Sequence, residues 1–239
     1  MKLRHTITAL LFSIAAINTG YTGQEEPLSI DHKTTALLIT DPQNDFLHEK
    51  GAAYGLIKDN LKKLNTIQHI GQLFKTAKET GMPVFVSPHM YFPHDDEWKN
   101  RGALQQTMND IDMFHVSAPL QAKGFKNSGA DFYAPYKKYI ADGKTVITSP
   151  HKIYGPESND LALQLRKQGI QTVLIGGMAA NLCTDSHMRE LIEQGFNVIM
   201  IKDAVGAPGE AAYQAALTNY SMIANGVITT EQAVQLMKP

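Results

Sequence analysis

The chain has 239 residues, of which 43% are hydrophobic and 19% are charged, and its formal net charge at pH 7 is −1. These values are typical of a globular protein with one large domain or two small ones. A net charge this close to zero, without a cluster of basic residues, argues against a nucleic-acid partner.

Residues 1–23 have the layout of a secretory signal peptide. Lys2 and Arg4 precede an apolar run at residues 7–17, and small and polar residues follow it. The run is too short to span a bilayer comfortably, so we expect cleavage after about residue 20, a periplasmic or secreted protein, and no membrane anchor in the mature chain. A buried or amphipathic N-terminal helix is the alternative.

From Ser29 onward, predicted strands and helices alternate. The strands are expected at residues 33–41, 82–88, 143–150, 172–175, 196–203 and 226–230, and the helices at residues 56–80, 160–167, 184–195, 209–224 and from residue 230 onward. The apolar runs of the strands do not alternate strictly, which is typical of strands covered on both faces. Helices between successive strands imply right-handed crossovers, so residues 29–239 are predicted to form one α/β domain with a mainly parallel six-stranded sheet and helices on both faces.

One long interval, residues 88–142, interrupts this alternation. A helix is expected at residues 97–110, and the interval is rich in aromatic residues, among them Tyr91, Phe92, Trp98, Phe114, Phe125, Phe132, Tyr133, Tyr136 and Tyr139. Connections this long are uncommon unless they are functional. We expect this insertion either to cover the site or to form a subunit contact in a homo-oligomer, and a surface loop that merely packs is the alternative.

Three reactive residues follow predicted strands at the carboxyl edge of the sheet, where open parallel sheets bind ligands. Asp41 ends the first strand, Lys152 follows the third, and Cys183, the only cysteine, follows the fourth. Cys183 should begin a helix, whose dipole and free N–H groups favour an anion, so we expect a lowered thiol pKa. Taken singly, these residues could be a turn aspartate, a solvated lysine and a buried apolar cysteine. Together they favour a nucleophile with an acid–base partner.

Three motifs resemble the isochorismatase-like cysteine hydrolases, a family that includes nicotinamidases and N-carbamoylsarcosine amidase. They read ALLITDPQNDF, SPHKIYGPESNDL and VLIGGMAANLCTDSHMRELIEQGFNVIMIKDA. The resemblance implies a doubly wound α/β fold and a catalytic triad of Asp41, Lys152 and Cys183. It also implies a cis peptide between Met178 and Ala179, which would direct the N–H of Ala179 beside that of Cys183 as an oxyanion hole.

The chain departs from the metal-binding branch of this family. That branch carries Asp-x-His after its second strand, whereas this chain has Ser87-Pro88-His89, with His94 nearby. Two histidines rarely make a tight site, so we expect metal-independent turnover and no cofactor.

The substrate pocket is expected to include Gln43, Phe46, His89 and Tyr154. The sequence therefore predicts a hydrolase that cleaves an amide or ureido C–N bond of a small molecule through a thioester on Cys183. An isochorismatase-type vinyl-ether hydrolase and a non-catalytic binding protein of the same fold are the alternatives.

Overall fold

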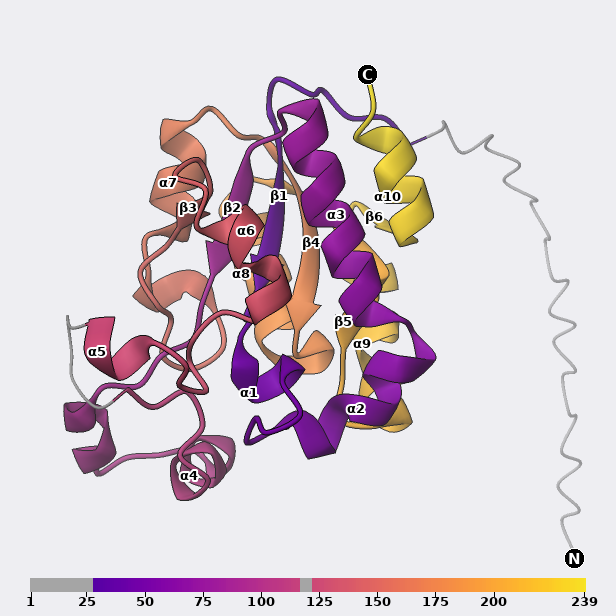
Figure 1. Ribbon diagram of the computed structural model, residues 1–239. Helices are drawn as coiled ribbons and strands as arrows, with labels where there is room; N and C mark the ends of the chain where they lie inside the picture. The colour runs from indigo at the N-terminus through magenta and orange to yellow at the C-terminus, as the bar shows by residue number, and fades with distance from the viewer. Residues whose placement is uncertain (1–27, 117–121) are drawn as a thin grey trace, which may run out of the picture.

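The computed structural model describes residues 28–116 and 122–239, so the predicted signal peptide at residues 1–23 lies outside the described part of the chain. Its centre is a six-stranded sheet, parallel throughout, with the order β3-β2-β1-β4-β5-β6 (Figure 1). The strands are β1 (Thr35–Thr40), β2 (Val84–Ser87), β3 (Val146–Ile147), β4 (Thr172–Met178), β5 (Asn197–Gly206) and β6 (Gly226–Ile228). The predicted parallel six-stranded sheet is confirmed.

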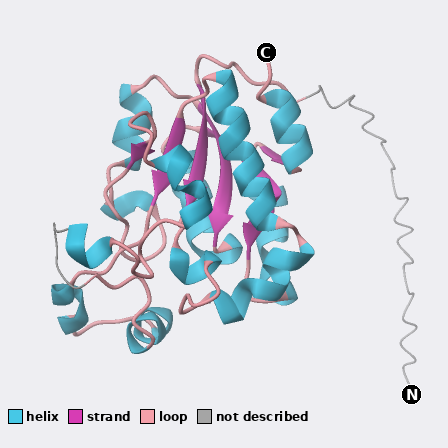
Figure 2. Cartoon of the chain, in the orientation of Figure 1, coloured by secondary structure: helices cyan, strands magenta, loops and turns pink. Residues whose placement is uncertain are grey.

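Helices surround the sheet, and most loops gather near its two ends (Figure 2). The longer helices are α2 (Tyr54–Lys63), α3 (Thr66–Thr80), α4 (Ala103–Asp110), α7 (Leu161–Lys167), α8 (Asp185–Glu193), α9 (Glu210–Ile223) and α10 (Thr230–Leu236). One-turn helices are α1 (Asn44–Leu47), α5 (Ala122–Phe125) and α6 (Lys137–Ile140). The described residues hold no helix of the length and apolarity that a membrane span requires.

The strands bury both faces, as β1 illustrates. Leu37 and Ile39 pack into a cluster with residues of α2, α3 and α10, whereas Ala36 and Leu38 pack with residues of α7, α8 and α9. Successive side chains of a strand point to opposite faces, so an uninterrupted apolar run is what a strand covered on both sides requires. This explains why strict polar–apolar alternation is missing from the sequence.

The predicted helix at residues 56–80 is divided into α2 and α3. Asn65 lies between them with φ of 55°, in the left-handed region, which breaks the helical hydrogen-bond ladder. Asparagine tolerates this conformation better than most residues, and the apolar spacing alone did not reveal the break.

The sheet reverses its direction of growth between β1 and β4. From β1 the chain proceeds outward to β2 and β3, and it then returns to place β4 on the other side of β1. Crevices at such switch points, beyond the carboxyl ends of the strands, are where doubly wound folds bind ligands. Asp41 directly follows β1, and Cys183 lies in a π-helical turn, Ala180–Thr184, between β4 and α8.

The described part of the insertion, residues 88–116 and 122–142, holds α4, α5 and α6; α4 and α5 lie beside the carboxyl ends of the strands, whereas α6 packs against α3 in front of the sheet (Figure 1). Its aromatic residues Tyr91, Phe114, Phe132 and Tyr136 are buried in the same apolar cluster as α2 and α3. The Tyr136 hydroxyl also donates to the Ile67 carbonyl at 2.7 Å. The insertion is therefore part of the domain's core.

Candidate active site

Asp41 is fully buried and its backbone adopts φ of 48°, in the left-handed region that few non-glycine residues occupy. Its N–H donates to the carbonyl of Ser87 at 3.0 Å, which ties the end of β1 to that of β2. Its Oδ1 lies 2.9 Å from Nε2 of His151, which is also fully buried. The first acid–base contact of the site is therefore Asp41 with His151.

Lys152 does not occupy the position that the family resemblance implies. Its Nζ donates to Oδ2 of Asp95 at 2.5 Å and lies 3.9 Å from the centre of the Phe92 ring. The cause is local backbone direction: His151 is bridged to His89 in a parallel β-bridge, and successive residues of an extended segment point to opposite sides. His151 faces Asp41, and Lys152 faces the insertion. The assignment of Lys152 to an Asp–Lys–Cys triad is therefore wrong for this structure.

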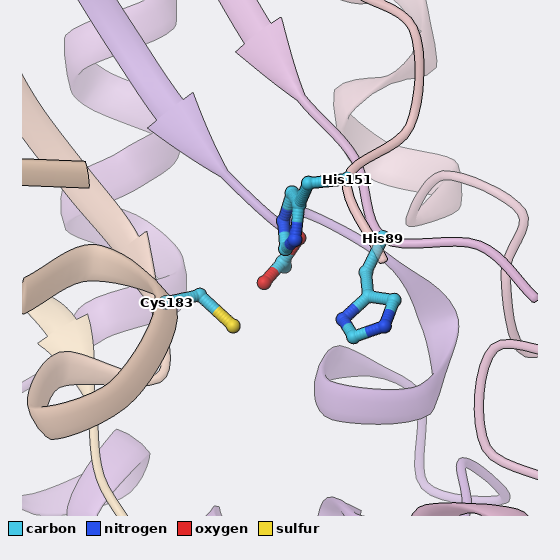
Figure 3. A group of neighbouring side chains, drawn as sticks. His89, His151 and Cys183 are labelled. Carbon is cyan, nitrogen blue, oxygen red and sulfur yellow. The ribbon is translucent and has the colours of Figure 1, made fainter. Parts of the chain in front are cut away.

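The Cys183 side chain points toward His89 and His151 (Figure 3). One donor atom from each of Asp41, His89, His151 and Cys183 lies within 4.8 Å of the others. The sulfur also donates a weak hydrogen bond to the carbonyl of Ile153 at 3.8 Å. The prediction that the first and fourth strands bring Asp41 and Cys183 together is thus confirmed.

The thiol differs from its predicted electrostatic state. Burial raises the pKa of Cys183 well above its ordinary value, and the nearby charge of Asp41 raises it further. The backbone N–H groups of Ala179 and Cys183 lower the pKa, but they do not offset the other two effects. The expected lowering by the helix terminus and Lys152 is therefore wrong, because burial dominates and Lys152 pairs elsewhere.

The peptide between Met178 and Ala179 is trans, since no cis peptide bond occurs in the described residues, which corrects the expected cis bond. The backbone N–H groups of Ala179 and Cys183 both lower the pKa of the Cys183 thiol, as donors that favour an anion at the sulfur do. Thr40 holds this turn, because its Oγ1 donates to the Met178 carbonyl at 3.1 Å and lies 3.0 Å from Oγ1 of Thr184. Two convergent N–H groups can hold an oxyanion without a cis bond.

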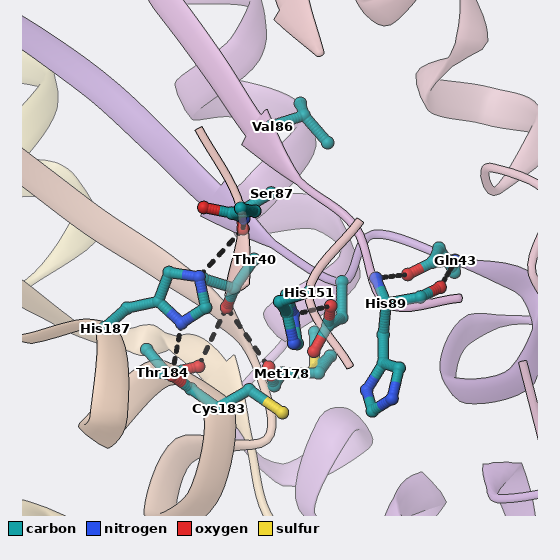
Figure 4. A network of polar contacts seen from close by, with 12 residues as sticks. Thr40, Gln43, Val86, Ser87, His89, His151, Met178, Cys183, Thr184 and His187 are labelled. Atoms are coloured by element: carbon teal, nitrogen blue, oxygen red, sulfur yellow. Dashed lines mark hydrogen bonds and ion pairs between the residues drawn. The ribbon is translucent and has the colours of Figure 1, made fainter. Parts of the chain in front are cut away.

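A third buried histidine, His187, supports the turn from α8 (Figure 4). Its Nδ1 lies 2.7 Å from the Cys183 carbonyl, which can only accept, so Nδ1 carries the proton. Its Nε2 therefore accepts from the Ser87 hydroxyl at 2.8 Å, while the Asn159 amide donates to that hydroxyl at 3.0 Å. Burial, together with His151, lowers the pKa of His187 to about 3, which keeps the ring neutral.

Gln43 and His89 were expected to line the substrate pocket, but they lie outside its lining and make other contacts. The Gln43 amide donates to the carbonyls of His89 and Ala130 and accepts from the N–H of His89. It therefore fixes two parts of the insertion to the turn after β1. The His89 ring stacks on Phe114 with 4.6 Å between ring centres. Burial, with a further contribution from His151, holds the pKa of His89 well below its ordinary value.

An apolar pocket opens onto Cys183. Phe46 and Tyr154 line it, as predicted, together with residues from α2, the insertion and the Cys183 turn. Its full lining is Phe46, Ala53, Leu56, Ile57, Leu104, Met108, Met113, Phe114, Ile153, Tyr154, Ala179, Leu182, Cys183 and Pro208. The insertion thus forms one wall of the site, as expected of a cover, and the lining carries no charged side chain.

The metal shell of the nicotinamidase-like branch does not fit this structure. Ser87, at the position of the expected aspartate, is engaged by His187 and Asn159. The His94 side chain is 66% exposed and lies near Asp95, at 3.4 Å. His151 and His187 are the residues that sequence reasoning missed. The signal for His151 was its position next to the motif lysine, and that for His187 was its spacing of four residues from Cys183 on one helix face.

Known proteins are similar to this chain in sequence. The family model described as Isochorismatase domain matches residues 35–232. The ureidoacrylate amidohydrolase RutB of Variovorax paradoxus is 24% identical over 90% of this chain and 85% of its own length. The isochorismatase family protein YecD of Escherichia coli O157:H7 is 27% identical over 75% of this chain and 84% of its own.

Solved structures agree on the fold. A cysteine hydrolase from Pseudomonas syringae pv. phaseolicola superposes with a TM-score of 0.70 at 19% identity, covering 89% of this chain and 98% of that one. N-carbamoylsarcosine amidase from Thermoplasma acidophilum superposes with a TM-score of 0.60 at 16% identity, covering 83% and 97%.

A doubly wound parallel sheet with a buried cysteine and carboxylate at its switch point defines a hydrolase of the α/β cysteine type. The match over residues 35–232 makes the assignment specific: the chain belongs to the isochorismatase family.

Proposed function

We propose that this protein hydrolyses an amide or ureido C–N bond of a small molecule through a thioester on Cys183. The observation that carries the proposal is the buried group of Asp41, His151 and Cys183 at the switch point, with a 2.9 Å contact between the first two. The C–N bond class is supported by the relatives named as a ureidoacrylate amidohydrolase and an N-carbamoylsarcosine amidase.

In this reaction, Asp41 is the base and His151 is a positioning residue. Oδ1 of Asp41 is held by His151, whereas Oδ2 has no hydrogen-bond partner within residues 28–116 and 122–239. Because the thiol pKa is raised, the thiol is protonated at rest and gives its proton to Asp41 as Sγ attacks the carbonyl carbon. The N–H groups of Ala179 and Cys183 stabilise the oxyanion.

Collapse of that intermediate breaks the C–N bond, and Asp41 returns the proton to the departing nitrogen. Water then attacks the thioester, again losing a proton to Asp41, and the acid leaves as the Cys183 thiol re-forms. Each proton that Asp41 accepts is therefore returned within one turnover, and no oxidant or further reactant is needed.

The apolar pocket next to Cys183 favours substrates whose acyl or leaving portion is uncharged. A carboxylate placed there would lose its hydration without gaining a cationic partner, which is strongly unfavourable. We therefore expect apolar amides to react faster than carboxylate-bearing ones.

The test is a screen of small amides and ureido compounds against the purified mature protein, with release of ammonia or amine as the readout. Cys183→Ala should lose about a thousandfold or more of the turnover, because the nucleophile is gone, while its circular dichroism stays native. Acid quenching during turnover should show the acyl mass on the peptide that contains Cys183. Turnover that persists in Cys183→Ala, with no acylated peptide, would contradict the proposal.

The predicted signal peptide leads us to propose further that the mature hydrolase works outside the cytoplasm. Cell fractionation of the native host, followed by N-terminal sequencing of the mature protein, tests this. A cytoplasmic protein that retains residues 1–23 would overturn it.

A further inference from the structure

The site contains more buried polar side chains than the proposed hydrolysis uses. Asp41, His89 and His151 are fully buried, and Cys183 is 5% exposed. The reaction above uses Asp41, His151 and Cys183, but it assigns nothing to the ring of His89. Yet that ring belongs to the same group of donor atoms, which lie within 4.8 Å of one another.

Several of these atoms lack hydrogen-bond partners within the described residues. They are both ring nitrogens of His89, Nδ1 of His151 and Oδ2 of Asp41. A buried polar atom without a partner costs about 1–3 kcal/mol, and such atoms are rare in folded proteins. Because a neutral imidazole has one lone pair, His89 and His151 each offer one nitrogen, and together with a carboxylate oxygen of Asp41 and the sulfur of Cys183 they form a set of electron-pair donors around one point.

We propose that Asp41, His89, His151 and Cys183 bind one divalent metal ion of the zinc class, and that the bound ion inhibits the hydrolase by occupying the Cys183 sulfur. The donor set has one sulfur, two imidazoles and one carboxylate, which is a combination that zinc accepts in tetrahedral coordination. Magnesium and calcium prefer oxygen ligands throughout, so this set disfavours them.

Charge balance supports this occupant. Binding releases the thiol proton, so a thiolate and a carboxylate face a doubly charged cation and the buried site becomes neutral overall. Donor atoms of a tetrahedral zinc shell lie about 3.3–3.8 Å apart, given the usual zinc–ligand bond lengths. The observed limit of 4.8 Å requires only a small inward rotation of the side chains.

The surroundings already hold two of the four donors in place. Gln43 fixes the backbone of His89 from both sides, and His187 donates to the carbonyl of Cys183. Such outer contacts orient ligands in metal sites and strengthen binding. This arrangement shares His89 with the family's Asp-x-His motif, but it differs from that metal shell because it includes the proposed nucleophile Cys183 and excludes Ser87 and His94.

The experiment uses untagged protein, freed of metal with a chelator under reducing conditions and then titrated with cobalt(II). Wild type should show a thiolate-to-cobalt charge-transfer band that saturates at one equivalent, and zinc should abolish it. Cys183→Ser should lose the band, and His89→Gln should weaken cobalt binding at least about tenfold. His94→Ala is the matched control and should bind as wild type does, because that side chain is exposed and lies outside the donor group.

Absence of the band in wild type overturns the proposal even if a variant fails to fold. A band that is unchanged in folded His89→Gln overturns the assignment of His89, and cobalt binding without any thiolate band overturns that of Cys183. Since the readout is spectroscopic, it does not depend on whether an amide substrate is found.

The inhibitory part rests on the proposed function and is measured with the best amide substrate. One equivalent of zinc should suppress turnover and a chelator should restore it, with the same dependence on His89. Zinc that is required for turnover would overturn the inhibition. An absence of amide turnover in metal-free protein would count against the proposed function alone.

Discussion

Two adjacent residues, His151 and Lys152, each pair with an aspartate, and the two pairs have different environments. His151 and Asp41 meet at 2.9 Å with both side chains fully buried at the sheet edge. Lys152 and Asp95 meet where the segment after β3 contacts the insertion, with the lysine side chain 21% exposed. The direction of an extended segment therefore selects which residue of a motif reaches the site. In the proposed reaction the buried pair serves the chemistry, whereas the partly exposed pair holds the insertion to the segment after β3.

Removing each basic residue in turn should separate the roles of the two pairs. His151→Ala should lower turnover by about a hundredfold or more, because Asp41 loses the contact that orients its carboxylate. Lys152→Ala should leave turnover per folded molecule nearly unchanged. The measurements are kcat and KM across pH.

Because His151 acts through Asp41, its loss should also alter the pH profile of kcat. His151→Lys should recover part of the turnover, since a lysine can also hold the carboxylate. If Lys152→Ala is the more damaging change, the triad expected from the family resemblance is restored and the present assignment fails.

Loss of Lys152 should lower the stability of the fold more than loss of a lysine from an exposed surface pair. Lys152→Met should lower the free energy of unfolding by about 1–3 kcal/mol. Within the described residues, the buried Asp95 carboxylate would then keep one hydrogen-bond donor, the N–H of Phe92. The measurement is urea denaturation followed by circular dichroism.

Lys75→Met is the matched control, since Lys75 lies 3.7 Å from Glu79 with both side chains more than 60% exposed, at 64% and 63%. It should change stability by less than about 0.5 kcal/mol. Equal losses in the two variants would show that the burial of Asp95 has no energetic effect.

A third pair, Lys78 with Asp142 at 2.8 Å, has intermediate exposure and lies away from the site. Burial raises the pKa of Asp142, but hydrogen bonds from Lys78 and from the N–H groups of Thr145 and Lys144 outweigh it and hold the pKa below its ordinary value. This pair therefore stabilises the fold above the ordinary carboxyl pKa, and the contribution is lost as pH falls through the lowered pKa.

Asp142→Asn should therefore cost about 1 kcal/mol at pH 7 and progressively less below about pH 4. Urea midpoints of both proteins between pH 7 and pH 3 provide the measurement. A difference that stays constant across this range would mean that the turn at residues 142–145, and not the carboxylate charge, supplies the stability.

The fold class and the positions of Asp41 and Cys183 follow from local patterns in the sequence. Apolar runs in the strands, and the motifs around Asp41 and Cys183, predict a parallel sheet with both residues at one edge, because these are local patterns fixed by periodicity and chain order. The same reasoning placed Phe46 and Tyr154 at the pocket and the insertion over it.

The side chains that complete the site depend on contacts between distant parts of the chain. The choice of His151 over Lys152 depends on a β-bridge to His89, a residue more than sixty positions earlier in the chain. The raised thiol pKa and the engagement of Gln43 depend likewise on groups from several loops. Burial and hydrogen bonding are properties of the assembled edge, and no local pattern in the sequence carries them.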